Sequence, residues 1–151
     1  MSKRMEQLEL LLEEISTTVD GIEETQFQKK PSPEKWSKLE ILGHLCDSAV
    51  NNHVRFMRIL TSDEPVTFEG YVQDEWVRRH GYQEHYGREE LLLVWNQLNG
   101  LIRNTLYSAA ESDWEKRCFF TDGTTMTLEE LYEDYIRHAR HHLAQISDPN
   151  R

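Results

Sequence analysis

The chain has 151 residues, of which 29% are charged, and its formal net charge is −10. This length is most simply one domain, residues 1–151, with a full hydrophobic core. The acidic balance argues against a nucleic-acid partner, because such partners are held mainly by Lys and Arg. No apolar run approaches the roughly 20 residues of a membrane-spanning helix, and the N-terminus lacks the apolar segment of a signal peptide. We therefore expect a cytoplasmic protein with no nucleic-acid or membrane partner.

The first predicted element is a helix over residues 3–20. A linker with Pro31 and Pro33 follows, and it cannot be helical throughout because proline lacks the backbone N–H group. The apolar residues of the helix recur at alternating spacings of three and four, which places them on one face that can pack in a bundle. These residues are Met5, Leu8, Leu12, Ile15 and Val19.

A second helix is predicted from Ser37 to about Leu60, because Ser37 and Glu40 have the spacing of a capping box. Its polar strip either faces solvent or lines a cavity shared with another helix. The strip comprises His44, Asp47, Ser48, Asn51 and Arg55. The main apolar face comprises Leu39, Leu42, Cys46, Ala49, Val50, His53, Met57 and Leu60.

The connection after this helix is long and rich in aromatic residues. Connections of such length are usually functional covers or contain short structure of their own. His80 and His85, close to Gly81 and Gly87, are expected at the surface. The aromatic residues are Phe68, Tyr71, Trp76, Tyr82 and Tyr86.

A third helix is predicted over about Arg88 to Ala110, and a fourth from Thr127 to about Ile146 with a capping box at Thr127 and Glu130. Asp122-Gly123 between them is typical of a tight hairpin or an irregular turn. The two cysteines form no CxxC motif, and we expect both to be buried. The pattern predicts an all-α fold, a four-helix up-and-down bundle, in which metal sites are commonly built from facing helices.

The fourth helix carries a histidine cluster. His138 and His142 are four residues apart and share one face at the border of the buried stripe, whereas His141 points away. Two such imidazoles can hold one divalent metal, and His44 would complete a three-ligand site of catalytic type. His53 is the rival third ligand. The alternative is a border of partly exposed histidines that are satisfied by water or carboxylates.

Several motifs in a fixed order resemble one known family. They are similar to the metal-binding pattern of the DinB-like superfamily, and in particular to the branch that contains YfiT-like bacillithiol transferases and metal-dependent hydrolases. The motifs are Trp36-Ser37, the run from Gly43 to Phe56, Tyr71 with Asp74-Glu75-Trp76, and His138-x-x-His141-His142-x-x-Gln145-Ile146.

This resemblance implies a four-helix bundle that holds one divalent metal ion, zinc or nickel, through His44, His138 and His142. It also implies a homodimer. The resemblance covers the chain from Trp36 to Ile146, but the connection between the second and third helices departs from the family in length and detail. That connection would contact a substrate.

Our leading hypothesis is a metal-dependent transferase, in which the metal activates a low-molecular-weight thiol to attack a small electrophile. The alternatives are a metal-dependent hydrolase that uses a metal-bound hydroxide, and a non-catalytic, stress-related bundle. Asp47, one turn after His44, is the candidate catalytic residue. The candidate substrate-binding residues are Asn51, Arg55 and Trp76, Tyr71 is a candidate pocket cover, and Asp134 and Gln145 are candidate partners of the imidazoles.

Overall fold

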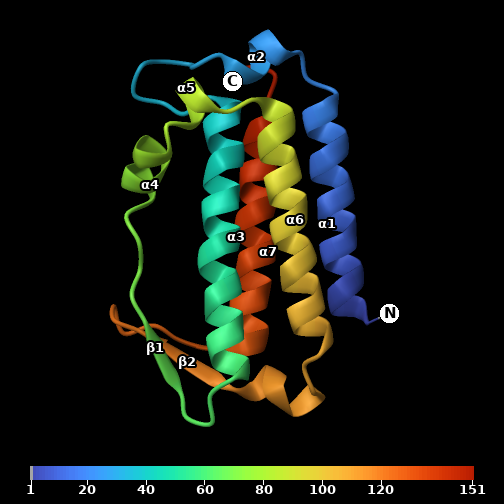
Figure 1. Cartoon of the computed structure of the whole chain (residues 1–151), viewed down its shortest axis with the longest axis vertical. Helices are drawn as coiled ribbons and strands as arrows, with labels where there is room; N and C mark the ends of the chain where they lie inside the picture. Colours follow the sequence, from blue (N-terminus) through green and yellow to red (C-terminus); the bar gives the residue numbers. More distant parts are fainter. Residues whose placement is uncertain (1) are drawn as a thin grey trace.

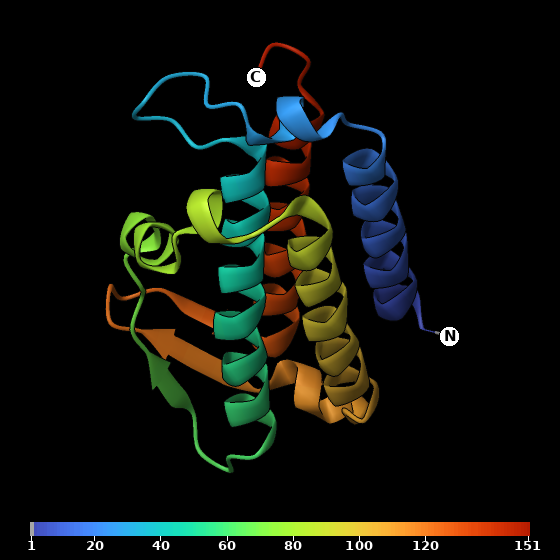
Figure 2. The same ribbon diagram turned by 45° about the horizontal axis from the view of Figure 1, so that its top comes forward.

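The computed structural model describes residues 2–151, and the described chain is built around four long helices that pack side by side (Figure 1). The predicted four-helix bundle is confirmed. Two of the helices, α1 and α7, run in one direction and the other two run in the opposite direction (Figures 1 and 2). The four helices are α1 (Lys3–Asp20), α3 (Lys38–Leu60), α6 (Arg88–Tyr107) and α7 (Leu128–Ser147).

The consecutive helices α3 and α6 are parallel, in contrast to the alternating order of the predicted up-and-down bundle, because the connection between them returns along the length of the bundle (Figure 1). This connection contains short structure of its own, as its length predicted. It consists of β1 (Val66–Phe68), α4 (Gln73–His80) and α5 (Tyr82–His85). A further short helix, α2 (Glu24–Gln28), lies in the linker between α1 and α3.

Of the two conformations expected at Asp122-Gly123, a tight hairpin or an irregular turn, the structure has the hairpin. Strands β2 (Arg117–Phe120) and β3 (Thr125–Thr127) pair antiparallel, and Gly123 supplies the positive φ angle of 96° that the turn requires. Strand β1 adds to the other edge of β2 in parallel. The helix α6 ends three residues before the predicted Ala110, and a 3₁₀ helix, η1 (Glu111–Glu115), follows it.

Both predicted capping boxes fix the start of a long helix. The Ser37 hydroxyl accepts a hydrogen bond from the Glu40 N–H at 3.1 Å, and the Glu40 carboxylate accepts one from the Ser37 N–H at 3.1 Å. Thr127 and Glu130 make the same reciprocal pair at the start of α7. The two helices that carry the histidine motifs therefore begin where their caps predict.

The buried face of α1 differs from the predicted face at one position. Leu11 is fully buried, whereas Leu12 is only partly buried. The reason is that α1 packs against both α6 and α7, so the buried surface is wider than one narrow stripe.

The face of α3 that was predicted to be its main apolar face is partly exposed. Val50 and Met57 lie at the surface, and His53 is half-buried with Nε2 3.3 Å from the Thr105 hydroxyl. The polar strip is instead buried over much of its length, including His44, Asp47 and Ser48. This difference arises because α3 packs against α6, α7 and the segment α4–α5 on three sides.

The segment α4–α5 approaches α3 closely at Gly43. Tyr82, at the start of α5, is buried against this glycine, and a Cβ atom at position 43 would lie closer than 3.0 Å to three atoms of its ring. Gly43 therefore makes room for an aromatic side chain directly against the backbone of α3. As predicted, Cys46 and Cys118 are buried and free. Within residues 2–151 the helices are all too short or too polar to cross a membrane.

We predict that Gly43→Ala lowers the free energy of unfolding by about 1–3 kcal/mol, because the added methyl group overpacks the contact with Tyr82. Urea denaturation measures this loss. Gly100→Ala in α6 is the matched control, since none of the described residues comes within 4 Å of an added Cβ atom there. Its better helix propensity should raise stability by up to about 1 kcal/mol. Equal effects of the two substitutions would contradict the close approach of Tyr82.

Candidate metal centre

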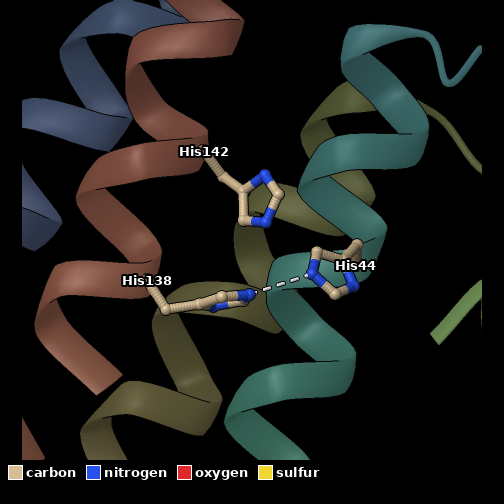
Figure 3. A group of neighbouring side chains, drawn as sticks. All are labelled: His44, His138 and His142. Atoms are coloured by element: carbon tan, nitrogen blue, oxygen red, sulfur yellow. Dashed lines mark hydrogen bonds between the residues drawn. The ribbon is translucent and has the colours of Figure 1, made fainter. Parts of the chain in front are cut away.

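Three histidine side chains meet between α3 and α7 (Figure 3). The Nε2 atoms of His44 and His138 lie 3.1 Å apart, and the ring of His142 lies 4.6 Å from each of the other two rings, measured between centroids. One ligand atom from each residue lies within 4.8 Å of the others. The structure therefore brings together the three histidines that the sequence selected.

The antiparallel packing of α3 against α7 places these residues. At the other end of this helix pair, the ring of Phe56 on α3 contacts those of Tyr132 and Tyr135 on α7 in the core, and these contacts fix the packing. One turn of α7 separates His138 from His142, so both imidazoles reach the same point on α3. His44 is fully buried there, and the other two histidines are partly buried.

Neighbouring side chains leave the Nε2 atoms available. The side-chain amide oxygen Oε1 of Gln145 accepts a hydrogen bond from Nδ1 of His142 at 2.8 Å, so the neutral ring has its lone pair on Nε2. The Ser48 hydroxyl lies 3.5 Å from Nδ1 of His138. The ring of His44 packs against Trp36 at a centroid distance of 4.9 Å. Gln145 is thus the predicted imidazole partner, whereas Ser48 was not predicted as one.

Burial keeps the three imidazoles neutral. It lowers the pKa of His44 to about 3, aided by the nearby rings of His142 and His138, and it lowers the pKa of His138 to about 4. The pKa of His142 is lowered for the same reason. A neutral imidazole is the form that coordinates a metal ion.

The donor set and its spacing fit a divalent metal ion. Two nitrogen ligands of a tetrahedral zinc ion lie roughly 3.3 Å apart, because each Zn–N bond is about 2.0–2.1 Å long. The observed separation of 3.1 Å between His44 and His138 is close to that value. Three protein ligands leave a coordination position open, which is typical of catalytic rather than structural sites.

The contacts of His53 and Asp134 bear on two further predictions, namely the rival third ligand and a candidate partner of the imidazoles. His53 points toward Thr105 of α6 and is not a member of the triad. Asp134 was predicted as an imidazole partner, but its carboxylate instead accepts a hydrogen bond from Arg137 at 2.8 Å. Its charge still acts on His138, where it raises the pKa against the effect of burial, but no hydrogen bond joins the two side chains among residues 2–151.

Asp47 lies on α3, one turn beyond His44, and its side chain is buried. Its Oδ1 atom accepts a hydrogen bond from the Tyr82 hydroxyl at 2.5 Å and lies 3.0 Å from Nδ1 of His80. Its Oδ2 atom has no hydrogen-bond partner among residues 2–151. Burial raises the pKa of the Asp47 carboxyl, whereas the contacts with Tyr82 and His80 act in the opposite direction.

The contact of His80 with Asp47 is the main feature that sequence reasoning missed. His80 is at the surface, as predicted, but its ring reaches inward to a buried carboxylate. Thirty-three residues separate the two in the chain, and the left-handed conformation of Gly81 (φ 59°) turns the backbone between His80 and Tyr82. In the sequence, the only signal for this contact was the position of Gly81 between His80 and Tyr82.

Two of the predicted substrate-binding residues, Asn51 and Arg55, lie on the polar strip of α3 that also carries Asp47. The third, Trp76, lies on α4, which packs against α3. Asn51 donates a hydrogen bond to the Asp47 carbonyl oxygen of its own helix at 2.9 Å. The Arg55 guanidinium lies 5.2 Å from the ring centre of Phe120. Trp76 and Tyr71 contact each other at 5.1 Å between ring centroids. Their role in substrate binding stays a prediction.

This combination of fold and site defines a class: helical bundles whose facing helices bring histidines together as a divalent-metal site. Residues 7–146 match the family model described as the DinB superfamily, and the chain belongs to this superfamily. The resemblance of the sequence motifs to that family is thereby confirmed.

Curated relatives and solved structures agree with this assignment. A protein of Halalkalibacterium halodurans named "Putative metal-dependent hydrolase" is 27% identical over 135 residues, which cover 89% of this chain and 75% of that protein. YfiT from Bacillus subtilis, described as "a probable metal-dependent hydrolase with an unusual four-helix bundle topology", has a TM-score of 0.85 at 22% identity, and the match covers 97% of this chain and 86% of that one. A mycothiol-dependent maleylpyruvate isomerase has a TM-score of 0.76 at 13% identity, and this chain spans 60% of its length.

We predict that the protein purified without a polyhistidine tag holds about one divalent metal ion per chain, because three neutral imidazoles converge on one point. His142→Ala should lose most of this metal, whereas His141→Ala should keep it, because His141 is the exposed neighbour outside the triad. Elemental analysis measures both. Equal metal contents in the two variants would contradict the assignment of the ligands.

We also predict that acid releases the metal below about pH 5–6, since protonated imidazole cannot coordinate. In the metal-free protein the lowered pKa values mean that the unfolded state binds more protons than the folded state below pH 6.5. The free energy of unfolding should therefore fall as the pH drops from 6.5 through about 4, as denaturation at each pH measures. Full metal occupancy at pH 4 would contradict histidine ligation.

Proposed function

We propose that this protein is a metal-dependent hydrolase of small molecules, with a zinc or nickel ion held by His44, His138 and His142. The observation that carries the proposal is the convergence of three imidazoles at one point, with a buried carboxylate that has one free oxygen one turn beyond His44 on α3. The name of the relative from Halalkalibacterium halodurans supports the same reaction class. Imidazole ligands suit both metals.

A divalent metal in such a site supplies Lewis acidity that makes water or a thiol a nucleophile near neutral pH. The protein's own groups would handle the protons. Asp47 would accept a proton at Oδ2 and return it to the leaving group, and its raised pKa brings its basicity closer to neutral pH. Gln145 and Ser48 would keep the imidazoles oriented throughout.

Arg55 indicates the substrate's chemistry. Its side chain donates to the Glu69 carbonyl oxygen at 3.3 Å, and among residues 2–151 no carboxylate pairs with it at salt-bridge distance. Guanidinium groups recognise carboxylates and phosphates through paired hydrogen bonds. We therefore assign Arg55, with Asn51 on the same strip, to binding an anionic group of the substrate, and Trp76 to covering it.

Thiol transfer is the second candidate function. Its support is the likeness of fold to a mycothiol-dependent isomerase and the open coordination position, which would also accept a thiol. In this reaction a low-molecular-weight thiol would give its proton to Asp47, and its sulfur would bond to an electrophilic carbon of a small molecule. The bond from that carbon to a chloride or to an epoxide oxygen would break, and an opened epoxide would take up the proton. The same three histidines and Asp47 would serve both reactions, so only the nucleophile differs. A non-catalytic, stress-related bundle is the remaining alternative.

We predict that the metal-loaded protein hydrolyses small activated esters that carry a carboxylate or phosphate group, without any added thiol. Asp47→Asn should lower the rate by about 10²–10⁴-fold while the metal content stays unchanged, because the proton acceptor is lost. Asp113→Asn is the matched control, since that carboxylate lies in η1, pairs with Lys116 and should be dispensable.

Assays of the metal-loaded protein with these esters, and with a thiol and an electrophile, also separate the alternative functions. Product that forms only with a thiol and a chloro-aromatic or epoxide substrate would favour thiol transfer over hydrolysis. The absence of any turnover by fully metal-loaded protein would contradict both reactions and leave the non-catalytic bundle.

A further inference from the structure

We propose that His80 and Tyr82 are positioning residues that hold the carboxyl group of Asp47 through its Oδ1 atom, so that Oδ2 remains free. The catalytic meaning of this arrangement rests on the proposed function, but the arrangement itself can be tested without any reaction.

Both contacts converge on one oxygen atom. The Tyr82 hydroxyl donates to Oδ1 at 2.5 Å, and Nδ1 of His80 lies 3.0 Å from the same atom. Within the described part of the chain, Oδ2 has no hydrogen-bond partner although it is buried. A buried oxygen without a hydrogen-bond partner has lost its hydrogen bonds to water and gained none from the protein. This is unusual unless a bound ligand or substrate supplies the missing hydrogen bond.

The fold builds this arrangement with two glycines. Gly43 allows the ring of Tyr82 to lie directly against α3, one turn before Asp47. Gly81 ends α4 in a left-handed conformation, so His80 and Tyr82 on either side of it reach the same carboxylate. Their rings contact each other at 5.0 Å between centroids, which fixes the two donors relative to one another.

The two donors also act against the effect of burial on the pKa of Asp47. The side chain of Asp47 is only 2% exposed, and burial favours its neutral form. Tyr82 and His80 favour the charged form through hydrogen bonds and, for His80, through charge. The other titratable groups near Asp47 are Tyr71 and Cys46, and burial raises the pKa of both, so they stay neutral and add no negative charge beside the carboxyl group.

His80 also connects the buried carboxylate with solvent. Its side chain is 44% exposed, so the same ring has one side in contact with Asp47 and another side accessible to water. The rings of Trp76 and Tyr82 pack against it at centroid distances of 6.0 and 5.0 Å. The position of this surface histidine is therefore fixed by aromatic packing, unlike that of a freely mobile surface side chain.

The test is to follow the carboxyl carbon of Asp47 by ¹³C NMR as a function of pH in the full-length protein, with zinc bound and after chelation. Tyr82→Phe retains the ring and removes the donor, so the pKa of Asp47 should rise by about one to two units, as expected for one hydrogen bond to a charged group. His80→Ala should raise it in the same direction. The matched controls are Tyr86→Phe and His85→Ala, which change neighbouring residues of the same types, and both should leave this pKa unchanged.

A second readout is the rate at which the zinc-loaded protein hydrolyses the small activated esters described above. The acidic limb of the kcat profile should move to higher pH in Tyr82→Phe and in His80→Ala by the same amount as the pKa of Asp47, with little change in KM. An unchanged pKa of Asp47 in both variants would overturn the positioning role. Shifted pKa values in a protein that hydrolyses no ester would support the positioning role and reject the proposed function.

Discussion

The antiparallel contact between α3 and α7 is the constraint on which the rest of the structure depends. It places His44 opposite His138 and His142, and the aromatic packing of Phe56 with Tyr132 and Tyr135 at the other end fixes the alignment of the two helices. The capping boxes at Ser37 and Thr127 fix where each helix begins. A shift of either helix by one residue would rotate its side chains by about 100° and separate the three rings.

This alignment has an energetic cost that points to a ligand. The three imidazoles are held neutral by burial, and Nδ1 of His44 and Oδ2 of Asp47 have no hydrogen-bond partner among residues 2–151. Buried polar atoms of this kind destabilise a fold unless something completes them. Because metal binding to a site formed only in the folded state stabilises that state, a bound ion would offset part of this cost.

Much of the fold was predictable because it depends on local rules. Apolar spacing located the four long helices, capping boxes located two of their starts, and Asp122-Gly123 located the hairpin. The spacing of His138 and His142 selected the pair on α7, and the family resemblance supplied His44. Each of these signals spans a few residues or a recognisable motif.

The features that were missed depend on tertiary packing. The polar strip of α3 has the pattern of a solvent-exposed face, and only the positions of α7, α4 and α5 bury it. Leu11 is buried because α1 touches two helices, and His80 contacts Asp47 because a distant segment folds back onto α3. No spacing rule within one helix predicts such contacts.

X-ray absorption spectroscopy of the metal-loaded protein tests the central claim most directly, because it reports the atoms bound to the metal. Coordination by three imidazoles predicts a first shell of nitrogen or oxygen atoms at roughly 2.0–2.1 Å for zinc, with the multiple scattering of three rings, and two rings in His44→Ala. A shell that contains sulfur, or an imidazole count that His44→Ala leaves unchanged, would contradict the account.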